Sequence, residues 1–436
     1  MKGFFGKIGA AIKAHKGRTI AISVTAFVLV CVIISLSLLS AFLFNRLSQG
    51  LVPTDEQLNA IRNDPANQYK RVVIIGVDGV GDYFSHMDTP NFDTMFNTAV
   101  DASVTYTGTA VYPTISCENW MSMFHGVRPV YHGFIFKDTN QRVEAGLKTD
   151  STKYPSFIQQ YLDQYAEGDV LSVCTWRGVN NGIIEDNERI VKYNTDTDQV
   201  KQFLAGETIY SPVTDLECQS NYKKENGEKV VEQNMSNSKY TEMVAYVEAP
   251  IRDDEVPGYP TLREYCLAMQ AAFGEEDETV AMRDAMTVQR IIEETTTAEG
   301  QDKYKIVYMH LDQVDHTGHN YGYGKPAYQQ AVYRIDDLIG KLYAAYENAN
   351  MLEDTLFVLC TDHGHRLPGG HKNHGKNTDL EVNITFAIAG KTVKAGMLTS
   401  RYVDTDMAAV ISYALGVKAA DTWQGRVPYN MFTLLD

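Results

Sequence analysis

The segment Met309-His310-Leu311-Asp312-Gln313-Val314-Asp315-His316-Thr317-Gly318-His319 places two carboxylates and three imidazoles within eleven residues. It follows directly on an apolar run, residues 305–308, that is typical of a buried strand. His, Asp and Glu side chains together are the ligands that a borderline divalent metal such as zinc prefers. A polar loop that is rich in Asp and His explains this cluster equally well, so the rest of the chain decides between the two interpretations.

An apolar strand that ends in polar residues recurs along the chain. Three further runs have the pattern of buried strands, at residues 71–78, 169–176 and 355–361. Amphipathic stretches lie between these runs, at residues 154–166, 277–294 and 328–348. This alternation predicts an α/β domain with a mostly parallel central sheet flanked by helices. Residues 178–258 interrupt the alternation because they are polar and rich in Asn and Glu, and we expect them to form an insertion or cap.

The first 50 residues differ in kind, with six basic side chains and no Asp or Glu. Residues 19–44 carry no charge and exceed the roughly 20 residues that cross a bilayer, whereas the apolar region of a cleaved signal peptide has about 7–15. Most of the basic residues precede this run, which places the N-terminus in the cytoplasm. We therefore expect four segments: a cytoplasmic basic segment (1–18), a transmembrane signal anchor (19–44), a linker (45–69) and a folded domain (70–436) that is extracellular, periplasmic or lumenal.

The charge of the outer domain argues against nucleic-acid polymers as partners. The whole chain has 39 basic and 55 acidic residues, and all but six of the basic ones follow residue 50, so residues 51–436 have a net charge near −22. A surface of this sign repels phosphate backbones and anionic lipid. Five cysteines are scattered over the same residues, which allows at most two disulfides and leaves their pairing open.

Residues of metal-ligating types stand at the ends of three of the predicted strands. Asp78 closes the first run, Asp315 follows the strand at 305–311, and Asp362 and His363 follow the run at 355–361. Singly, each carboxylate can be a turn cap. The carboxyl ends of parallel strands, however, open onto the crevice in which α/β sheets bind ligands. Buried carboxylates need partners, and metal ions provide them.

Ser116 stands at the predicted start of a helix. Pro113 disfavours helix before it, and the residues after Ser116 have a helical pattern. A hydroxyl at this position is commonly an N-cap. The N-terminus of a helix also favours an anion, through its free N–H groups and its dipole. Beside a metal the same hydroxyl can ionise and act as a nucleophile.

These segments occur in the order found in the alkaline phosphatase superfamily, and the chain most resembles its nucleotide pyrophosphatase/phosphodiesterase branch. The resemblance runs from about residue 71 to residue 432, is weak across 178–258, and rests on five segments: Asp78, 113–119, 315–322, 362–364 and 374–375. Such proteins have a central sheet between helices and two zinc ions. The resemblance implies that one zinc is held by Asp315, His319 and His374. It assigns the other zinc to Asp78, Asp362 and His363, together with the nucleophile Ser116.

Two residues depart from the pattern of that branch. Thr usually stands where this chain has Ser116, and Lys137 occupies the position of an Asn that contacts the phosphate. A Lys can still offer charge to a phosphoryl oxygen. Sulfatases, a sister group, need Cys-x-Pro-x-Arg, and the run here is Cys117-Glu118-Asn119-Trp120-Met121, which argues against a sulfatase.

The sequence therefore predicts a membrane-anchored two-zinc hydrolase that cleaves phosphodiester or pyrophosphate bonds through a phospho-serine intermediate. Its substrate is a small phosphate ester, with nucleotides, phospholipid head groups and sugar phosphodiesters all open. A phosphomonoesterase, a phosphotransferase and a catalytically silent metal-bound binding module are the alternatives. Four neighbours are expected to orient the ligands, namely Asp312, His316, His365 and His371. Four others are expected to be structural, namely Asn119, Trp120, His125 and His132.

Overall fold

The computed structural model describes residues 32, 50–99, 101–135, 138–195, 224–225, 228–229, 275–365 and 372–435. The chain divides into Met1–Gly50 and Leu51–Asp436, and only the second unit is described below. The predicted anchor, apart from Val32, lies outside the described residues, as do Lys137 and His371. Within the described part of the chain, no helix is long and apolar enough to cross a membrane.

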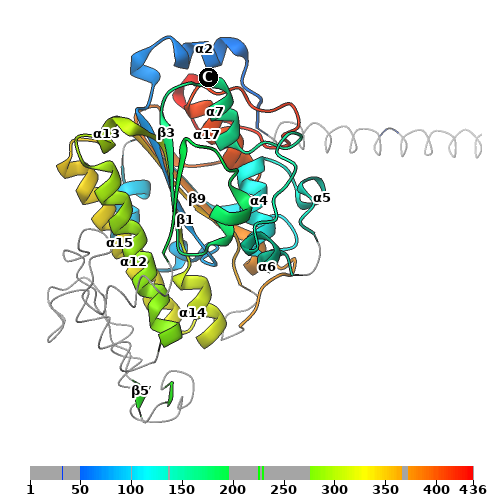
Figure 1. The fold of residues 1–436 in the computed structure, drawn as a ribbon, viewed down its shortest axis with the longest axis vertical. Coiled ribbons are helices and arrows are strands. Elements are labelled where there is room, and N and C mark those ends of the chain that lie inside the picture. Colours follow the sequence, from blue (N-terminus) through cyan, green and yellow to red (C-terminus); the bar gives the residue numbers. More distant parts are fainter. Residues whose placement is uncertain are drawn as a thin grey trace, which may run out of the picture. The chain divides into compact units, whose positions relative to one another are not determined.

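A mostly parallel sheet of eight strands forms the centre of the second unit (Figure 1), in the order β10-β2-β9-β8-β1-β7-β3-β4. The strands are β1 (Arg71–Val77), β2 (Ala102–Thr109), β3 (Asp169–Cys174), β4 (Ile190–Asn194), β7 (Tyr304–Leu311), β8 (Thr355–Thr361), β9 (Asn383–Ala389) and β10 (Gly396–Met397). Neighbours from β8 to β4 are parallel, whereas β9 runs antiparallel to both β8 and β2. The predicted α/β fold is confirmed.

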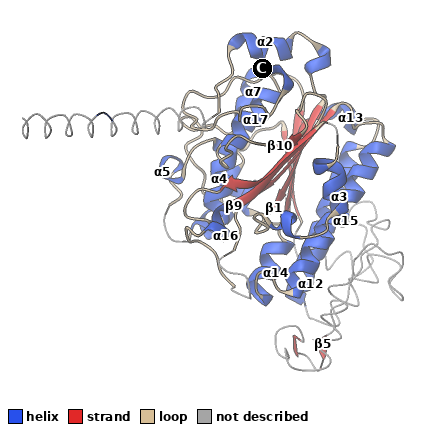
Figure 2. Ribbon diagram, turned by 180° about the vertical axis from the view of Figure 1, so that it is seen from behind, coloured by secondary structure: helices blue, strands red, loops and turns tan. Residues whose placement is uncertain are grey.

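Helices cover both faces of this sheet (Figure 2). The longer ones are α2 (Asp55–Arg62), α4 (Ser116–His125), α7 (Phe157–Gln164), α12 (Glu275–Thr295), α14 (Gln313–Tyr321), α15 (Pro326–Asn348) and α17 (Asp406–Ala414). Short helices complete the set: α3 (Pro90–Phe92), α5 (Pro129–His132), α6 (Thr139–Glu144), α13 (Gly300–Lys303), α16 (Asp379–Val382), η1 (Pro65–Asn67), η2 (Tyr83–His86), η3 (Asp93–Asn97), η4 (Val179–Ile183) and η6 (Thr433–Leu435). A separate pair, β5 (Lys224–Glu225) and β6 (Glu228–Lys229), lies outside the main sheet.

The central strand β1 shows why these residues form a buried parallel sheet. Every residue of β1 is buried, as is every residue of β8. Alternate side chains enter two cores: Val73 and Ile75 pack in the core with α12 and α15, while Val72 and Ile74 pack in the core with α4, α7 and α17. A strand that is covered on both faces needs apolar residues at every position, and this produces the continuous run seen in the sequence.

Part of the predicted insertion belongs to the main sheet. Residues 179–183 form η4, and β4 (Ile190–Asn194) pairs in parallel with β3. Only the first residue of β4 is fully buried, because this strand lies at the sheet edge. Its sequence therefore lacks the apolar run that marks the inner strands. Residues 190–194 therefore belong to the main sheet, and most of residues 196–258, the rest of the predicted insertion, lie outside the described part of the chain.

Candidate metal centre

The predicted site residues meet at the carboxyl ends of β1, β7 and β8. Val77, the last residue of β1, is level with Leu311 in β7 and with Thr361 in β8. The residues that follow the three strands therefore share one edge of the sheet. Asp78 follows β1, Asp362 follows β8, and α14, which carries two more site residues, begins just after β7.

Ser116 and His363 lie beside Asp78 and Asp362. Ser116 begins α4, and its Oγ lies 3.3 Å from Asp78 Oδ1 and 3.3 Å from His363 Nε2. The same Nε2 lies 3.4 Å from Asp78 Oδ1 and 3.3 Å from Asp362 Oδ2. The potential ligand atoms of Asp78, Asp362 and His363 all lie within 4.8 Å of one another. This group has the donors and the spacing of a metal site with a hydroxyl at its edge.

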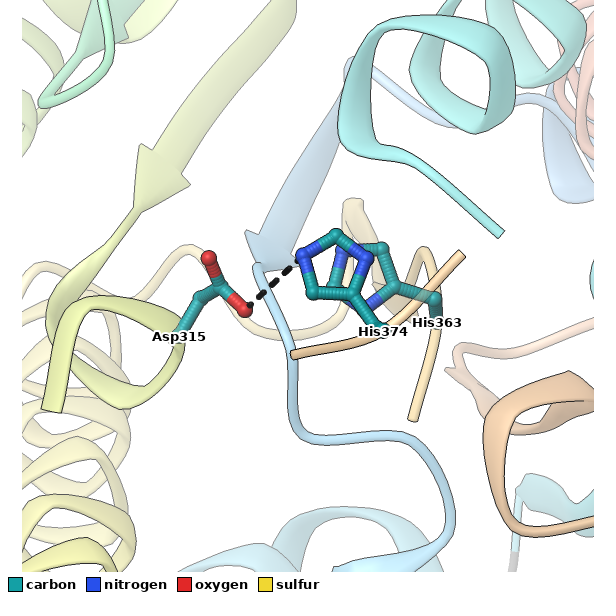
Figure 3. Close-up of side chains that lie close together, drawn as sticks. All are labelled: Asp315, His363 and His374. Atoms are coloured by element: carbon teal, nitrogen blue, oxygen red, sulfur yellow. Dashed lines mark ion pairs between the residues drawn. The ribbon is translucent and has the colours of Figure 1, made fainter. Parts of the chain in front are cut away.

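Asp315, His319 and His374 form an adjoining group. Asp315 and His319 lie four residues apart on α14 and so face the same side of that helix. His319 Nε2 lies 3.2 Å from Asp315 Oδ2 and 3.1 Å from His374 Nε2. Figure 3 shows Asp315 facing the stacked rings of His363 and His374, whose centroids are 3.7 Å apart. The two groups therefore touch, and all residues predicted to hold metal are gathered at one place.

The hydrogen bonds of the three histidines fix which ring nitrogen carries the proton. Each Nδ1 faces a backbone carbonyl, which can only accept a hydrogen bond, so each Nδ1 donates. These bonds run from His319 to Lys372 O (2.7 Å), from His374 to Thr114 O (2.6 Å) and from His363 to Gly364 O (3.0 Å). In the neutral ring each Nε2 is then left with a lone pair, the form in which histidine binds metals. Two such lone pairs, on His319 and His374, face each other, which is repulsive unless a cation or a proton lies between them.

Asp362 has one satisfied and one unsatisfied oxygen. Oδ1 accepts hydrogen bonds from the backbone N–H groups of Gly79 (3.0 Å) and His363 (2.9 Å). Oδ2 is buried and accepts no hydrogen bond. Burial raises the pKa of Asp362 well above its usual range, and the charges of Asp78 and Asp315 add to this effect. A buried oxygen of this kind needs a proton or a cation, and it lies beside His363 Nε2.

Asp78 and Asp315, the other two carboxylates of the centre, each accept hydrogen bonds at one of their two oxygens. Asp78 Oδ2 accepts from Trp120 Nε1 (3.0 Å) and His310 Nε2 (3.1 Å), and Asp315 Oδ1 accepts a short hydrogen bond from the Tyr323 hydroxyl. Burial opposes ionisation of Asp315, but the charges of His319, His374 and His363 and the hydrogen bond from His319 together outweigh it and hold the pKa of that carboxyl well below its usual range. The residues present therefore fit divalent cations: the carboxylates are oriented, and the imidazoles present lone pairs.

Metal binding should release protons from this centre. Asp315 raises the pKa of His319 to about 9, so in the metal-free protein the imidazolium persists up to that pH. A divalent metal ion bound at His319 would have to displace this proton, and we therefore expect metal affinity to rise by up to about tenfold per pH unit below pH 9 and to level off above it. Calorimetric titrations at pH 7, in buffers of different ionisation enthalpy, measure the protons released. A pH-independent affinity with no proton release would contradict this prediction.

Several residues that shape the centre did not stand out in the sequence. His310 and Tyr323 bond to the site carboxylates. Trp120, predicted to be structural, is buried but also bonds to Asp78. The Thr114 hydroxyl donates to Lys376 O (2.8 Å) and accepts from Gly375 N–H (3.1 Å), which ties the loop of His374 to the segment before Ser116. Of these side chains only His310 is of a metal-ligating type, and the sequence pattern assigned it no role.

Three of the neighbours that were expected to orient the ligands, His365, His316 and Asp312, lie in the described part of the chain. The His365 ring stacks on Tyr323, with centroids 5.1 Å apart, and Tyr323 bonds to Asp315. His316 Nε2 lies 2.8 Å from Asn320 Nδ2, and Asp312 precedes the first turn of α14.

The neighbours that were expected to be structural bond to the protein frame. Asn119 donates to Pro113 O (3.2 Å) and Ile115 O (2.9 Å). His125 bonds to the carbonyls of Tyr154 and Ile183, and His132 to the Ser122 hydroxyl.

The α/β sheet carries a hydroxyl and two carboxylate–imidazole groups at the carboxyl ends of its strands, and these are the donors of a metal-dependent phosphoesterase site. The alkaline phosphatase PafA shares the fold, with a TM-score of 0.53, 13% identity, and coverage of 84% of this chain and 99% of its own. Residues 72–367 match the family Type I phosphodiesterase / nucleotide pyrophosphatase. The chain belongs to this family.

Curated relatives match over shorter segments. GPI ethanolamine phosphate transferase 2 of Aspergillus oryzae is 37% identical over 71 residues, which are 16% of this chain and 8% of that protein. The catalytic subunit of human GPI ethanolamine phosphate transferase 3 is 30% identical over 112 residues, 26% of this chain and 10% of its own length. The matched segments thus cover a small share of those relatives.

Proposed function

We propose that this protein is a two-zinc phosphoesterase that cleaves phosphodiester or pyrophosphate bonds with Ser116 as its nucleophile. One observation carries the proposal: the Nε2 atoms of His319 and His374 lie 3.1 Å apart beside buried carboxylates, and one of these carboxylates, Asp362, has an oxygen without a hydrogen-bond donor. Membership of the phosphodiesterase family supports a phosphate ester as substrate.

The ligands divide into the two groups described above. Asp315, His319 and His374 would hold one zinc, and Asp78, Asp362 and His363 would hold the other with Ser116 at its edge. Nitrogen and carboxylate oxygen donors suit zinc, and three protein ligands per ion leave a position for substrate. Asp78 Oδ2 already accepts two hydrogen bonds, so Oδ1, which lies near Ser116 and His363, is the oxygen that would face a metal.

In the proposed reaction the chain supplies a nucleophile and a place for the phosphoryl charge. When bound, the metal ions would supply positive charge that favours the ionised hydroxyl of Ser116 and offsets the charge of the phosphoryl oxygens. Ser116 Oγ forms a bond to phosphorus as the bond from phosphorus to the leaving oxygen breaks, and the leaving oxygen takes up a proton. Water then attacks the phospho-serine and restores the hydroxyl. The N-terminus of α4 favours the anionic groups involved.

We also propose that residues 19–44 anchor the protein in a membrane, with the catalytic domain outside the cytoplasm. The charge-free run and the basic residues before it support this topology. Protease that reaches only the non-cytoplasmic face of the membrane should digest the catalytic domain, whereas digestion from the cytoplasmic face alone would contradict the topology.

A phosphotransferase is the second candidate, because the curated relatives are named as ethanolamine phosphate transferases. The same phospho-serine would then pass its group to an alcohol instead of water. Turnover in the presence of ethanolamine or glycerol, with product analysis, distinguishes the two: a transfer product that exceeds the hydrolysis product supports the transferase.

We expect diesters to be better substrates than monoesters. In the described part of the chain, the groups that bond to Ser116 and Asp78 are carboxylate, imidazole and indole groups, and none of them is an Arg or Lys that could clamp the second charge of a monoester. Lys137, which the resemblance places near the phosphate, lies outside the described residues. The ratio of kcat/KM for bis(4-nitrophenyl) phosphate to that for 4-nitrophenyl phosphate should be about tenfold or more, a difference of about 1.4 kcal/mol in transition-state stabilisation. A strong preference for the monoester would overturn the diesterase assignment and favour a phosphomonoesterase.

A further inference from the structure

Asp78 is held by two aromatic ring donors on the same oxygen. Trp120 Nε1 donates over 3.0 Å and His310 Nε2 lies at 3.1 Å, both at Oδ2. Trp120, His310 and Asp78 are each almost completely buried. A carboxylate oxygen has two lone pairs, so these donors saturate Oδ2. They turn the other oxygen, Oδ1, toward Ser116 and His363.

Trp120 and Ser116 are part of the same helix. Ser116 is the first residue of α4 and Trp120 lies one turn later, so the two side chains share a face of that helix. The indole therefore ties the start of α4 to the carboxylate that stands at the end of β1. Ser116 Oγ lies 3.3 Å from Asp78 Oδ1, the other oxygen of the same carboxylate.

His310 supports the link from the other side. Its ring makes an edge contact with Trp120, with centroids 5.1 Å apart, and a tilted contact with Trp176 at 5.8 Å. It comes from β7, whereas Trp120 comes from α4 and Asp78 follows β1. Three elements thus converge on one carboxylate oxygen.

We infer that Trp120 is a positioning residue: its indole N–H, together with His310, restricts Asp78 to one metal-facing oxygen and aligns the Ser116 hydroxyl with that oxygen. This inference rests on the proposed function. Residues that orient a metal ligand in this way typically contribute about 10–100-fold to metal affinity or activity. Packing alone would not require the N–H group, so a substitution that removes this group and keeps an aromatic ring separates the two roles.

The test compares Trp120→Phe with a matched control, Trp423→Phe. Trp423 is also buried, its Nε1 donates to Pro155 O over 2.9 Å, and its ring contacts Gly126 at the opposite end of α4. Zinc content, zinc dissociation into a competing chelator, kcat and KM are measured for the wild type and both variants.

We expect Trp120→Phe to lower kcat by about 10–100-fold with little change in KM, and to release one of the two zinc ions about 10–100-fold faster. Trp423→Phe should match the wild type in each measurement. Equal losses in both variants would show that packing is responsible and would overturn the inference, as would wild-type behaviour of Trp120→Phe. A wild type that neither binds zinc nor turns over would instead contradict the proposed function.

A second measurement does not depend on the folding of Trp120→Phe. The chain has three tryptophans, so the double variant Trp176→Phe/Trp423→Phe retains only Trp120. Because its indole N–H is bonded to a proposed zinc ligand, adding zinc to the metal-free double variant should shift its fluorescence emission. Zinc binding without a change in emission would overturn the inference.

Discussion

Replacing Ser116 with alanine should lower kcat for phosphate esters by about 10⁴-fold or more while both zinc ions stay bound. The substitution removes the only hydroxyl described within reach of both Asp78 Oδ1 and His363 Nε2. It leaves Asp78, Asp362 and His363 in place, and these three can still hold their zinc. Turnover and zinc content, measured on the same preparation, check both halves of the prediction. Absence of a phosphorylated protein after rapid acid quenching should accompany the loss of turnover.

Ser122→Ala is the matched control for this substitution. Ser122 lies on the same helix and is buried, but its hydroxyl bonds to Glu118 O (2.7 Å) and lies 3.1 Å from His132 Nε2. It makes no contact with the metal centre, so its loss should leave kcat near the wild-type value. Turnover that persists in Ser116→Ala would sink the covalent mechanism, whereas loss of zinc from that variant would show that Ser116 is needed to hold the metal.

The strands and the gathering of the site residues could be predicted because both follow from local sequence. A strand that is buried on both faces reads as a continuous apolar run, as β1 and β8 do. The residue after such a strand lies at the carboxyl edge of a parallel sheet, so Asp78 and Asp362 had to be near each other once β1 and β8 were neighbours. The assignment of zinc ligands came from the family resemblance, and it remains a prediction.

The groups that orient the ligands could not be predicted because they depend on packing between distant segments. Trp120 and His310 both bond to Asp78, but they are 42 and 232 positions away from it in the sequence. A tryptophan in an apolar helix has the pattern of a core residue, and Trp120 does pack in the core. The hydrogen bond from its indole N–H to Asp78 can be recognised only once Asp78 is known to lie beside it. Edge strands pose a related difficulty, since the partly exposed β4 lacks the apolar run of the inner strands.

Asp362→Asn should abolish the stabilisation of the protein by zinc while leaving the metal-free protein about as stable as the wild type. In the metal-free state burial already raises the pKa of Asp362 well above its usual range, so burial disfavours the charged form of this carboxyl. The amide oxygen of Asn can accept the two N–H groups that Oδ1 accepts now, from Gly79 and His363. Its NH₂ group would then face His363 Nε2, which lies 3.3 Å from Oδ2, and can donate to that lone pair.

The substitution should weaken zinc binding, because a neutral amide replaces an anionic ligand and the NH₂ group of this amide would occupy the place of the metal. Wild-type protein at zinc concentrations about 1,000-fold above Kd should gain about 4 kcal/mol per site in the free energy of unfolding, and Asp362→Asn should lose this gain at one site together with at least about 10³-fold in kcat. Asp354→Asn is the control: this carboxylate lies just before β8, at the opposite end of the same strand, and pairs with Lys70 at 3.2 Å. Chemical denaturation without zinc measures the free energy of unfolding of the metal-free protein, and the same experiment with zinc measures the gain that zinc binding adds. Asp354→Asn makes the same substitution far from the metal centre. If Asp354→Asn keeps the zinc-dependent gain in the free energy of unfolding and Asp362→Asn loses it, the loss can be assigned to Asp362 as a metal ligand. An undiminished gain in Asp362→Asn would remove that residue from the metal site.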